Sequence, residues 1–158
     1  AGGPFPHGAS SLREQHGDWT VICSTGKSGD EDVKSCILQQ EQVRQVTNGP
    51  SQRVLAIEFQ RNAKGLEGVL VLPLGLNLVD GAVLQIDGNK AMEPRPFRTC
   101  LYAGCIVNVT ADDKMVAGLA KGKAMTVKTT NNEGKATEFS ISLAGFQAAL
   151  ERASDLVK

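Results

Sequence analysis

The stretch Asp18-Trp19-Thr20-Val21-Ile22-Cys23, together with the later Cys36, decides the fold. Its aromatic and β-branched residues are typical of a β-strand, and this strand ends on a cysteine. A second pair, Cys100 and Cys105, flanks the turn-like segment Leu101-Tyr102-Ala103-Gly104. Close cysteine pairs beside predicted turns favour disulfides that form outside the cytosol. We therefore expect an exported, β-rich protein that is held by disulfide bonds.

The pairing of the four cysteines is left open by the sequence, because four cysteines permit three connectivities. Local pairing, Cys23 with Cys36 and Cys100 with Cys105, is favoured because both short loops close easily. A zinc site is a weaker alternative, since structural zinc uses pairs about two to four residues apart and the first pair is wider. A redox site is weaker still, because no Cys-x-x-Cys motif is present.

Length, charge and termini limit the class of protein. A chain of 158 residues is expected to form one core. Its formal net charge is zero, so no basic surface for nucleic acid is indicated. No apolar run approaches the ~20 residues of a membrane-spanning helix. We expect residues 1–16, rich in Gly, Pro, Ser and His, to be a flexible leader left after removal of a signal peptide, and residues 17–158 to be a single domain.

Alternating apolar residues and turn signals predict about eight or nine strands. Residues 66–72 are nearly all apolar, which predicts a central strand covered on both faces, and residues 24–32 are expected to form a polar loop. Helical patterns follow Asp112 and span 143–157. The fold class is therefore mainly β, an antiparallel β-sandwich or partly open barrel with one short helix and a C-terminal helix. The other strands are expected at 18–23, 34–47, 53–60, 82–86, 105–110, 124–130 and 135–142.

Catalytic motifs are not indicated by the sequence. The two histidines, His7 and His16, lie in or beside the predicted leader, which is a poor place for a general base. The segment Gly26-Lys27-Ser28 resembles the end of a phosphate-binding loop, but Val21 stands where that motif requires glycine. We therefore expect no enzyme activity, no cofactor and no metal ion.

Other notable residues have structural interpretations. Asp112 and Asp113 are favoured as helix-capping residues rather than as acid–base groups, because carboxylates bind the free N–H groups of a helix N-terminus. Trp19, the only tryptophan, is favoured as a core residue near the first cysteine pair, with a partner-binding anchor as the alternative.

An ordered set of short motifs resembles the invasion-associated locus B family of exported bacterial proteins. The motifs extend over nearly the whole chain after the predicted leader. They are Gly17-Asp18-Trp19 with Cys23, Cys36 with Gln39, Arg53 to Glu58, Leu72-Pro73-Leu74-Gly75, Asp87-Gly88, Pro96-Phe97 with Cys100, Gly104-Cys105, and Ser142-Leu143-Ala144-Gly145-Phe146.

The resemblance implies a periplasmic or secreted protein of a Gram-negative bacterium, with peripheral association with the outer membrane. It further implies a role in host-cell invasion through binding of a host-cell surface or envelope protein, and it supplies no catalytic residues. Two alternatives remain beside partner binding. A periplasmic small-ligand-binding module would need an apolar cavity with convergent polar groups. A hydrolase would need a carboxylate pair assembled by the fold.

Overall fold

A computed structural model of the chain describes residues 3, 5–29, 31–44, 52–62 and 65–157. These residues form ten strands, two α-helices and one short 3₁₀ turn. In chain order the elements are η1 (Pro6–Gly8), β1 (Ser11–His16), β2 (Trp19–Ser28), β3 (Glu31–Arg44), β4 (Gln52–Asn62), β5 (Gly65–Leu72), β6 (Val83–Ile86), β7 (Phe97–Leu101), β8 (Gly104–Ala111), α1 (Asp113–Lys121), β9 (Ala124–Thr130), β10 (Ala136–Ser142) and α2 (Phe146–Leu156).

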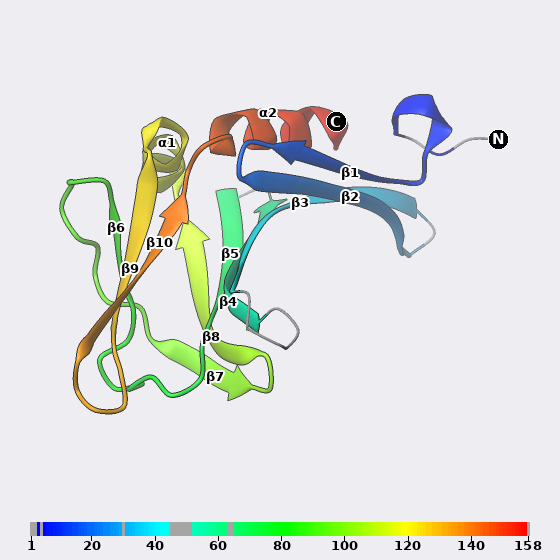
Figure 1. Cartoon of the computed structure of the whole chain (residues 1–158). Coiled ribbons are helices and arrows are strands. Elements are labelled where there is room, and N and C mark those ends of the chain that lie inside the picture. Colours follow the sequence, from blue (N-terminus) through cyan, green and yellow to red (C-terminus); the bar gives the residue numbers. More distant parts are fainter. Residues whose placement is uncertain (1–2, 4, 30, 45–51, 63–64, 158) are drawn as a thin grey trace.

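The strands form two antiparallel sheets. The large sheet has seven strands in the order β1-β2-β3-β4-β5-β8-β7, and the small sheet has the order β10-β9-β6. The large sheet curves, so that β5 and β8 face the small sheet while β1, β2 and β3 turn away from it (Figure 1). Helix α2 packs across β2 and β3, and α1 lies beside it at the same end of the molecule. This architecture confirms the predicted antiparallel, mainly β fold.

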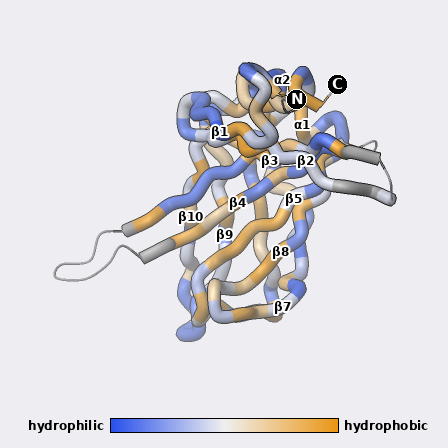
Figure 2. Tube along the Cα trace, turned by 90° about the vertical axis from the view of Figure 1, so that its right-hand side faces the viewer, coloured by the Kyte–Doolittle hydropathy of each residue, from blue (hydrophilic) through white to orange (hydrophobic). Residues whose placement is uncertain are grey.

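The core lies between the two sheets and beneath α2, and its inward residues alternate with outward ones. On β4, Leu55, Ile57 and Phe59 are buried while Glu58 and Gln60 are exposed, which is the alternation that the sequence predicted. The hydropathy colouring in Figure 2 shows the same mixture of apolar and polar residues along the strands of the large sheet. Burial of one such large apolar side chain stabilises the fold by roughly 1.5–3 kcal/mol.

Three aromatic rings join α2 to the large sheet. Trp19 is fully buried, and its ring centroid lies 5.1 Å from that of Phe146 and 6.1 Å from that of Phe59. The indole Nε1 donates a hydrogen bond of 2.9 Å to the Ser142 carbonyl oxygen. The predicted core role of Trp19 is therefore confirmed, because a fully buried side chain cannot anchor a partner.

Several local predictions are confirmed. Strands β9 and β10 form the expected hairpin, with Met125, Val127 and Ile141 buried. The Asp112 side chain accepts a 2.8 Å hydrogen bond from the Met115 N–H and so caps α1. These elements follow from short-range patterns, which is why the sequence alone predicts them.

The predicted polar loop at 24–32 is wrong. Strand β2 continues to Ser28 and β3 starts at Glu31, so the two strands pair far beyond Cys23 and Cys36. Gly29, at a φ of +66°, lies in the tight turn that joins them. The described residues of this segment are therefore paired strands rather than an irregular loop. The predicted turn at 48–50 lies outside the described residues.

The prediction of a flexible leader is also wrong for part of residues 1–16. Residues Ser11–His16 form β1, which pairs along its whole length with β2 as an edge strand. Phe5 is buried at 3% exposure, although the segment around it is rich in Gly and Pro. The side chains of β1 alternate between exposed and half-buried and none is fully buried, so the composition of the segment did not reveal the strand.

Two further differences concern β5 and β7. Strand β5 is central, as expected, but only one of its faces is buried: Leu70 is inaccessible, whereas Glu67 and Val69 on the opposite face are exposed. Strand β7 (Phe97–Leu101) was not predicted, because Pro94 and Pro96 precede it and mask the pattern. It pairs with β8 at the far edge of the large sheet.

Candidate interaction surface

The cysteine pairs lie across neighbouring strands. Cys23 on β2 stands opposite Cys36 on β3, with a Cα–Cα distance of 4.1 Å and the sulfur atoms at bonding distance. Cys100 on β7 stands opposite Cys105 on β8, with a Cα–Cα distance of 3.9 Å and its sulfur atoms likewise at bonding distance. The first pair is buried in the core, and the second holds the base of the β7–β8 turn.

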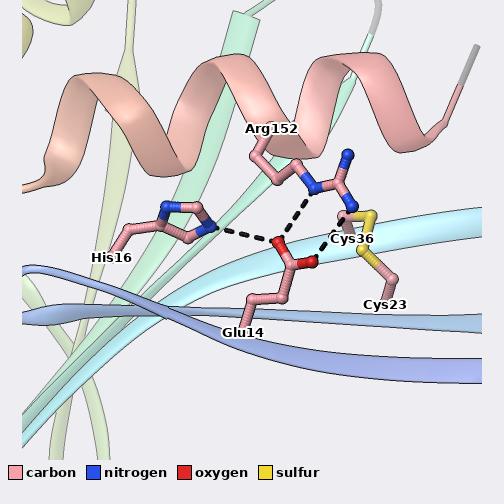
Figure 3. A network of polar contacts seen from close by, with 5 residues as sticks. All are labelled: Glu14, His16, Cys23, Cys36 and Arg152. Atoms are coloured by element: carbon pink, nitrogen blue, oxygen red, sulfur yellow. Dashed lines mark hydrogen bonds and ion pairs between the residues drawn. A yellow bond between two sulfur atoms is a disulfide. The ribbon is translucent and has the colours of Figure 1, made fainter. Parts of the chain in front are cut away.

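A polar cluster beside the first cysteine pair connects β1 to α2 (Figure 3). Arg152 donates two hydrogen bonds to Glu14, from Nε to Oε1 at 2.8 Å and from Nη2 to Oε2 at 3.0 Å. His16 Nε2 lies 3.1 Å from Glu14 Oε1. The hydrogen bond from Arg152 lowers the pKa of Glu14 below its ordinary value of 4.5, and the His16 ring adds to that effect. Because both oxygens of the Glu14 carboxylate accept hydrogen bonds from Arg152, the cluster is suited to holding α2 against β1.

Two polar residues of the family motifs, Asp87 and Glu58, have hydrogen-bond partners. Asp87 accepts hydrogen bonds from the backbone N–H groups of Lys123 and Ala124, at 3.0 and 3.1 Å, and so joins the β6 turn to the start of β9. Glu58 is exposed and accepts a 2.9 Å hydrogen bond from Gln39. Within the described part of the chain, no group of three or more His, Cys, Asp and Glu side chains is arranged to hold a metal ion.

Exposed apolar side chains gather at the end of the molecule opposite α1 and α2. Of the eight large apolar side chains that are exposed among the described residues, five belong to two neighbouring turns. We call these five residues the apolar end: Leu74, Leu78, Val79, Leu101 and Tyr102. Val79 and Tyr102 are the most exposed, at 91% and 105%. In Figure 1 the β7–β8 turn and the β9–β10 turn lie on opposite sides of this end, and the loop after β5 runs between them.

Backbone pairing places the start of the loop after β5 beside the β7–β8 turn. Leu72, the last residue of β5, pairs with Cys105 at the start of β8, so the loop after β5 leaves the sheet beside the β7–β8 turn. Gly104 adopts a φ of +142°, and a Cβ there would collide with the Leu72 carbonyl oxygen. Glycine at position 104 therefore permits the close approach of the two segments.

The loop after β5 is also attached to the small sheet. The Asn77 N–H donates to the Thr130 carbonyl oxygen at 2.8 Å, and the Asn132 N–H donates to the Gly75 carbonyl oxygen at 3.0 Å. Asn77 Oδ1 accepts from the Val79 N–H at 3.0 Å, which holds the tip of the loop in a turn. The exposed Leu78 and Val79 are thus presented on a backbone that is fixed on both sides.

Charge is sparse at the apolar end. Residues 73–81 contain a single charged residue, Asp80, and residues 101–104 contain none. In the adjacent β9–β10 turn, Lys135 Nζ and Glu133 Oε2 lie 3.7 Å apart, so the two charges offset each other. A surface with apolar side chains and little net charge suits the centre of a protein–protein contact, where charged residues are depleted.

Sequence reasoning did not identify these residues. The segment 69–84 showed only as an apolar stretch interrupted by turn residues, and the five members come from two segments that lie 22 to 28 positions apart. One available signal was Leu78-Val79 between Asn77 and Asp80, since two large apolar residues in a polar turn have no core to enter.

No helix in the described part of the chain is long and apolar enough to cross a membrane.

Comparisons with known proteins agree with this architecture. A sequence model of the family described as Invasion associated locus B (IalB) protein matches residues 19–154. The Invasion protein B homolog of Brucella abortus (strain 2308) is 43% identical over 156 residues, covering 98% of this chain and 86% of that protein. Invasion protein B of Bartonella bacilliformis is 31% identical over 158 residues, covering 98% of this chain and 81% of that protein.

A solved structure shows the same fold. The crystal structure of invasion associated protein b from Bartonella henselae superposes with a TM-score of 0.80 at 31% sequence identity, covering 92% of this chain and 97% of that one. The family resemblance drawn from the sequence motifs is therefore confirmed. Together these matches show that the chain belongs to the invasion associated locus B (IalB) protein family.

Proposed function

We propose that this protein is an exported, envelope-associated bacterial protein that supports host-cell invasion by binding a partner through the apolar end, without catalysing a reaction. The observation that carries the proposal is the concentration of five exposed apolar side chains on two fixed turns. Contiguous exposed apolar surface in a folded protein commonly marks an interaction site. The names of the relatives, which are invasion proteins, supply the biological setting.

The chemistry of the apolar end favours a protein partner on the host-cell surface or in the bacterial envelope. Tyr102 projects fully into solvent, and tyrosine is enriched at protein interfaces because one side chain offers both apolar area and a hydroxyl group. Export is supported by the two cysteine pairs at bonding distance, since such bonds persist outside the reducing cytosol.

The test compares purified variants as bait for host-cell surface and envelope extracts. Val79→Ser and Tyr102→Ser should each reduce retention of a partner about tenfold or more, as hot-spot residues do. Val33→Ser is the matched control, because Val33 is exposed at 41% on β3 and lies outside the apolar end. Retention that is equal for all three variants, or self-association of the protein through the same residues, would contradict the proposal.

The proposed compartment is tested separately by cell fractionation. The protein should be recovered from the periplasm, the outer-membrane fraction or the culture medium with no reactive thiols. Recovery from the cytosol with alkylatable cysteines would contradict export and leave the binding experiment unaffected.

A further inference from the structure

A groove of about 740 Å³ lies away from the apolar end, where the segment 89–96, the last residues of β8 and the start of α1 meet. Its walls combine apolar side chains, among them Ile86, Met92 and Met115, with three basic ones. Ligand pockets commonly measure about 300–1,000 Å³ and combine an apolar lining with a few polar groups. The groove therefore has the size and the composition of a small-molecule site.

The segment that forms one wall of the groove is held against the edge of β6. The backbone groups of Arg95 and Ala82 exchange two hydrogen bonds of 2.8 Å, and the Met92 N–H donates to the Leu84 carbonyl oxygen at 2.9 Å. At the other end of the segment, Gln85 Nε2 donates to the Asn89 carbonyl oxygen at 2.6 Å. The wall is thus positioned before any ligand binds, which reduces the entropic cost of binding.

Arg95 lies in this wall with few partners. Its Nη1 is 3.5 Å from the Thr110 carbonyl oxygen and its Nη2 is 3.6 Å from Met115 Sδ, both long contacts to uncharged atoms. Its Nε is buried and has no hydrogen-bond partner within the described part of the chain. A partly buried guanidinium normally meets an anion, because burial of an unpaired charge is costly.

The other charges of the groove leave it with a surplus of positive charge. Lys90 and Lys114 line it beside Arg95, and the two acidic residues are Glu93 and Asp112. The Asp112 carboxylate is engaged as the cap of α1, where it accepts from the Met115 N–H. Glu93 is exposed to solvent. An anionic group placed in the groove would therefore meet three cations and one uncommitted carboxylate.

We infer that this groove binds a small single-chain amphiphile whose anionic oxygen head group pairs with Arg95 and whose apolar chain lies against Met92 and Met115. The guanidinium offers N–H donors in a planar fork that matches two oxygen atoms of one head group. Lys90 and Lys114 add attraction at longer range. This site goes beyond the proposed partner binding and does not depend on it, since the two surfaces share no residue.

The three methionines allow a direct test. In protein labelled with ¹³C at the methionine methyl groups, titration with decanoate should shift the signals of Met92 and Met115 in a saturable manner. The signal of Met125 should not move, because Met125 is fully buried and lies outside the groove. Decyl phosphate should act in the same way, whereas decyltrimethylammonium, which has an equal chain and the opposite charge, and acetate, which has no chain, should not.

The role of Arg95 is tested by Arg95→Gln, with Arg98→Gln as the matched control, because Arg98 is exposed on β7 and does not line the groove. Loss of a hydrogen bond to a charged group should weaken decanoate binding about tenfold or more in Arg95→Gln and leave it unchanged in Arg98→Gln. Ala91→Trp, which fills the groove from an exposed position, should abolish binding without touching the core.

The variants are first compared by thermal unfolding. If Arg95→Gln fails to fold, Ala91→Trp alone decides the question. Equal shifts of all three methionine signals, equal binding of the cationic amphiphile, or unchanged affinity in Ala91→Trp would overturn the inference.

Discussion

Glu14 on β1 and Arg152 on α2 form a two-pronged ion pair across 138 positions of sequence, with N–O distances of 2.8 and 3.0 Å. The pair joins the N-terminal edge strand to the C-terminal helix beside the Cys23–Cys36 pair (Figure 3). It secures β1, an edge strand that pairs with β2 alone. The interaction therefore ties together the two ends of the described chain.

Replacing Glu14 by Gln should destabilise the protein modestly. The two side chains are 28% and 34% exposed, so solvent weakens the ion pair. We expect a decrease in Tm of at most about 4 °C, measured by circular dichroism. In a double-mutant cycle with Arg152→Met, the second substitution should cost little once Glu14 is neutral. Fully additive effects would show that the pair is not energetically coupled.

The contribution of Glu14 should depend on pH in one direction. Because its pKa is lowered in the folded state, the carboxylate stabilises the fold at pH values above 4.5, and this contribution is lost as the pH falls through the lower, folded-state pKa. The Tm difference between the wild type and Glu14→Gln should be constant near neutral pH and shrink toward zero in acid. A difference that grows on acidification would contradict the assigned direction.

Peptide mapping without reductant should recover Cys23 linked to Cys36 and Cys100 linked to Cys105. Replacing both cysteines of a pair by alanine should cost about 3 kcal/mol for the first loop and about 2 kcal/mol for the second in the chain-entropy model. Urea unfolding of the two double variants measures both losses of stability and shows which one is larger. Crossed links, free thiols or a larger loss from the second pair would reject these assignments.

Trp19→Ala should be severely destabilising, by about 3–5 kcal/mol, because it leaves a cavity against Phe59 and Phe146. It also leaves the Ser142 carbonyl oxygen without its indole donor. Tyr102→Ala is the matched aromatic control: its side chain is fully exposed, so we expect a change within about 0.5 kcal/mol. Urea titrations followed by circular dichroism compare the two. Similar losses would mean that the apolar end is part of the folded core.

Limited proteolysis should leave β1 attached to the folded body. Ser11–His16 pairs throughout with β2, and Phe5 is buried, so cleavage between Leu12 and Gly17 requires unfolding. N-terminal sequencing should find stable fragments that begin at or before Ser11. Early release of residues 1–16 would instead support a flexible leader.

The number of domains is tested by unfolding. Unfolding in a single transition would support the proposal that the chain is one domain.

The sequence alone predicted the elements that depend on neighbouring residues. The alternation of Leu55, Ile57 and Phe59 specifies a half-buried strand wherever that strand lies. Asp112 caps α1 because its carboxylate accepts from a backbone group three residues away. The sequence alone also predicted the protein family, because the family motifs follow one another along the chain.

Only the tertiary structure decided which distant segments meet. Strand β1 lacks a clear apolar pattern of its own, and it forms because its backbone pairs with that of β2. The apolar end depends on β5 pairing with β8, which places Leu72 opposite Cys105, and the groove depends on Arg95 lying next to Met115. Short-range patterns in the sequence determine individual strands and helix caps. The apolar end and the groove depend instead on the order of strands in the sheets, which is set by the packing of the whole core and not by any one stretch of residues.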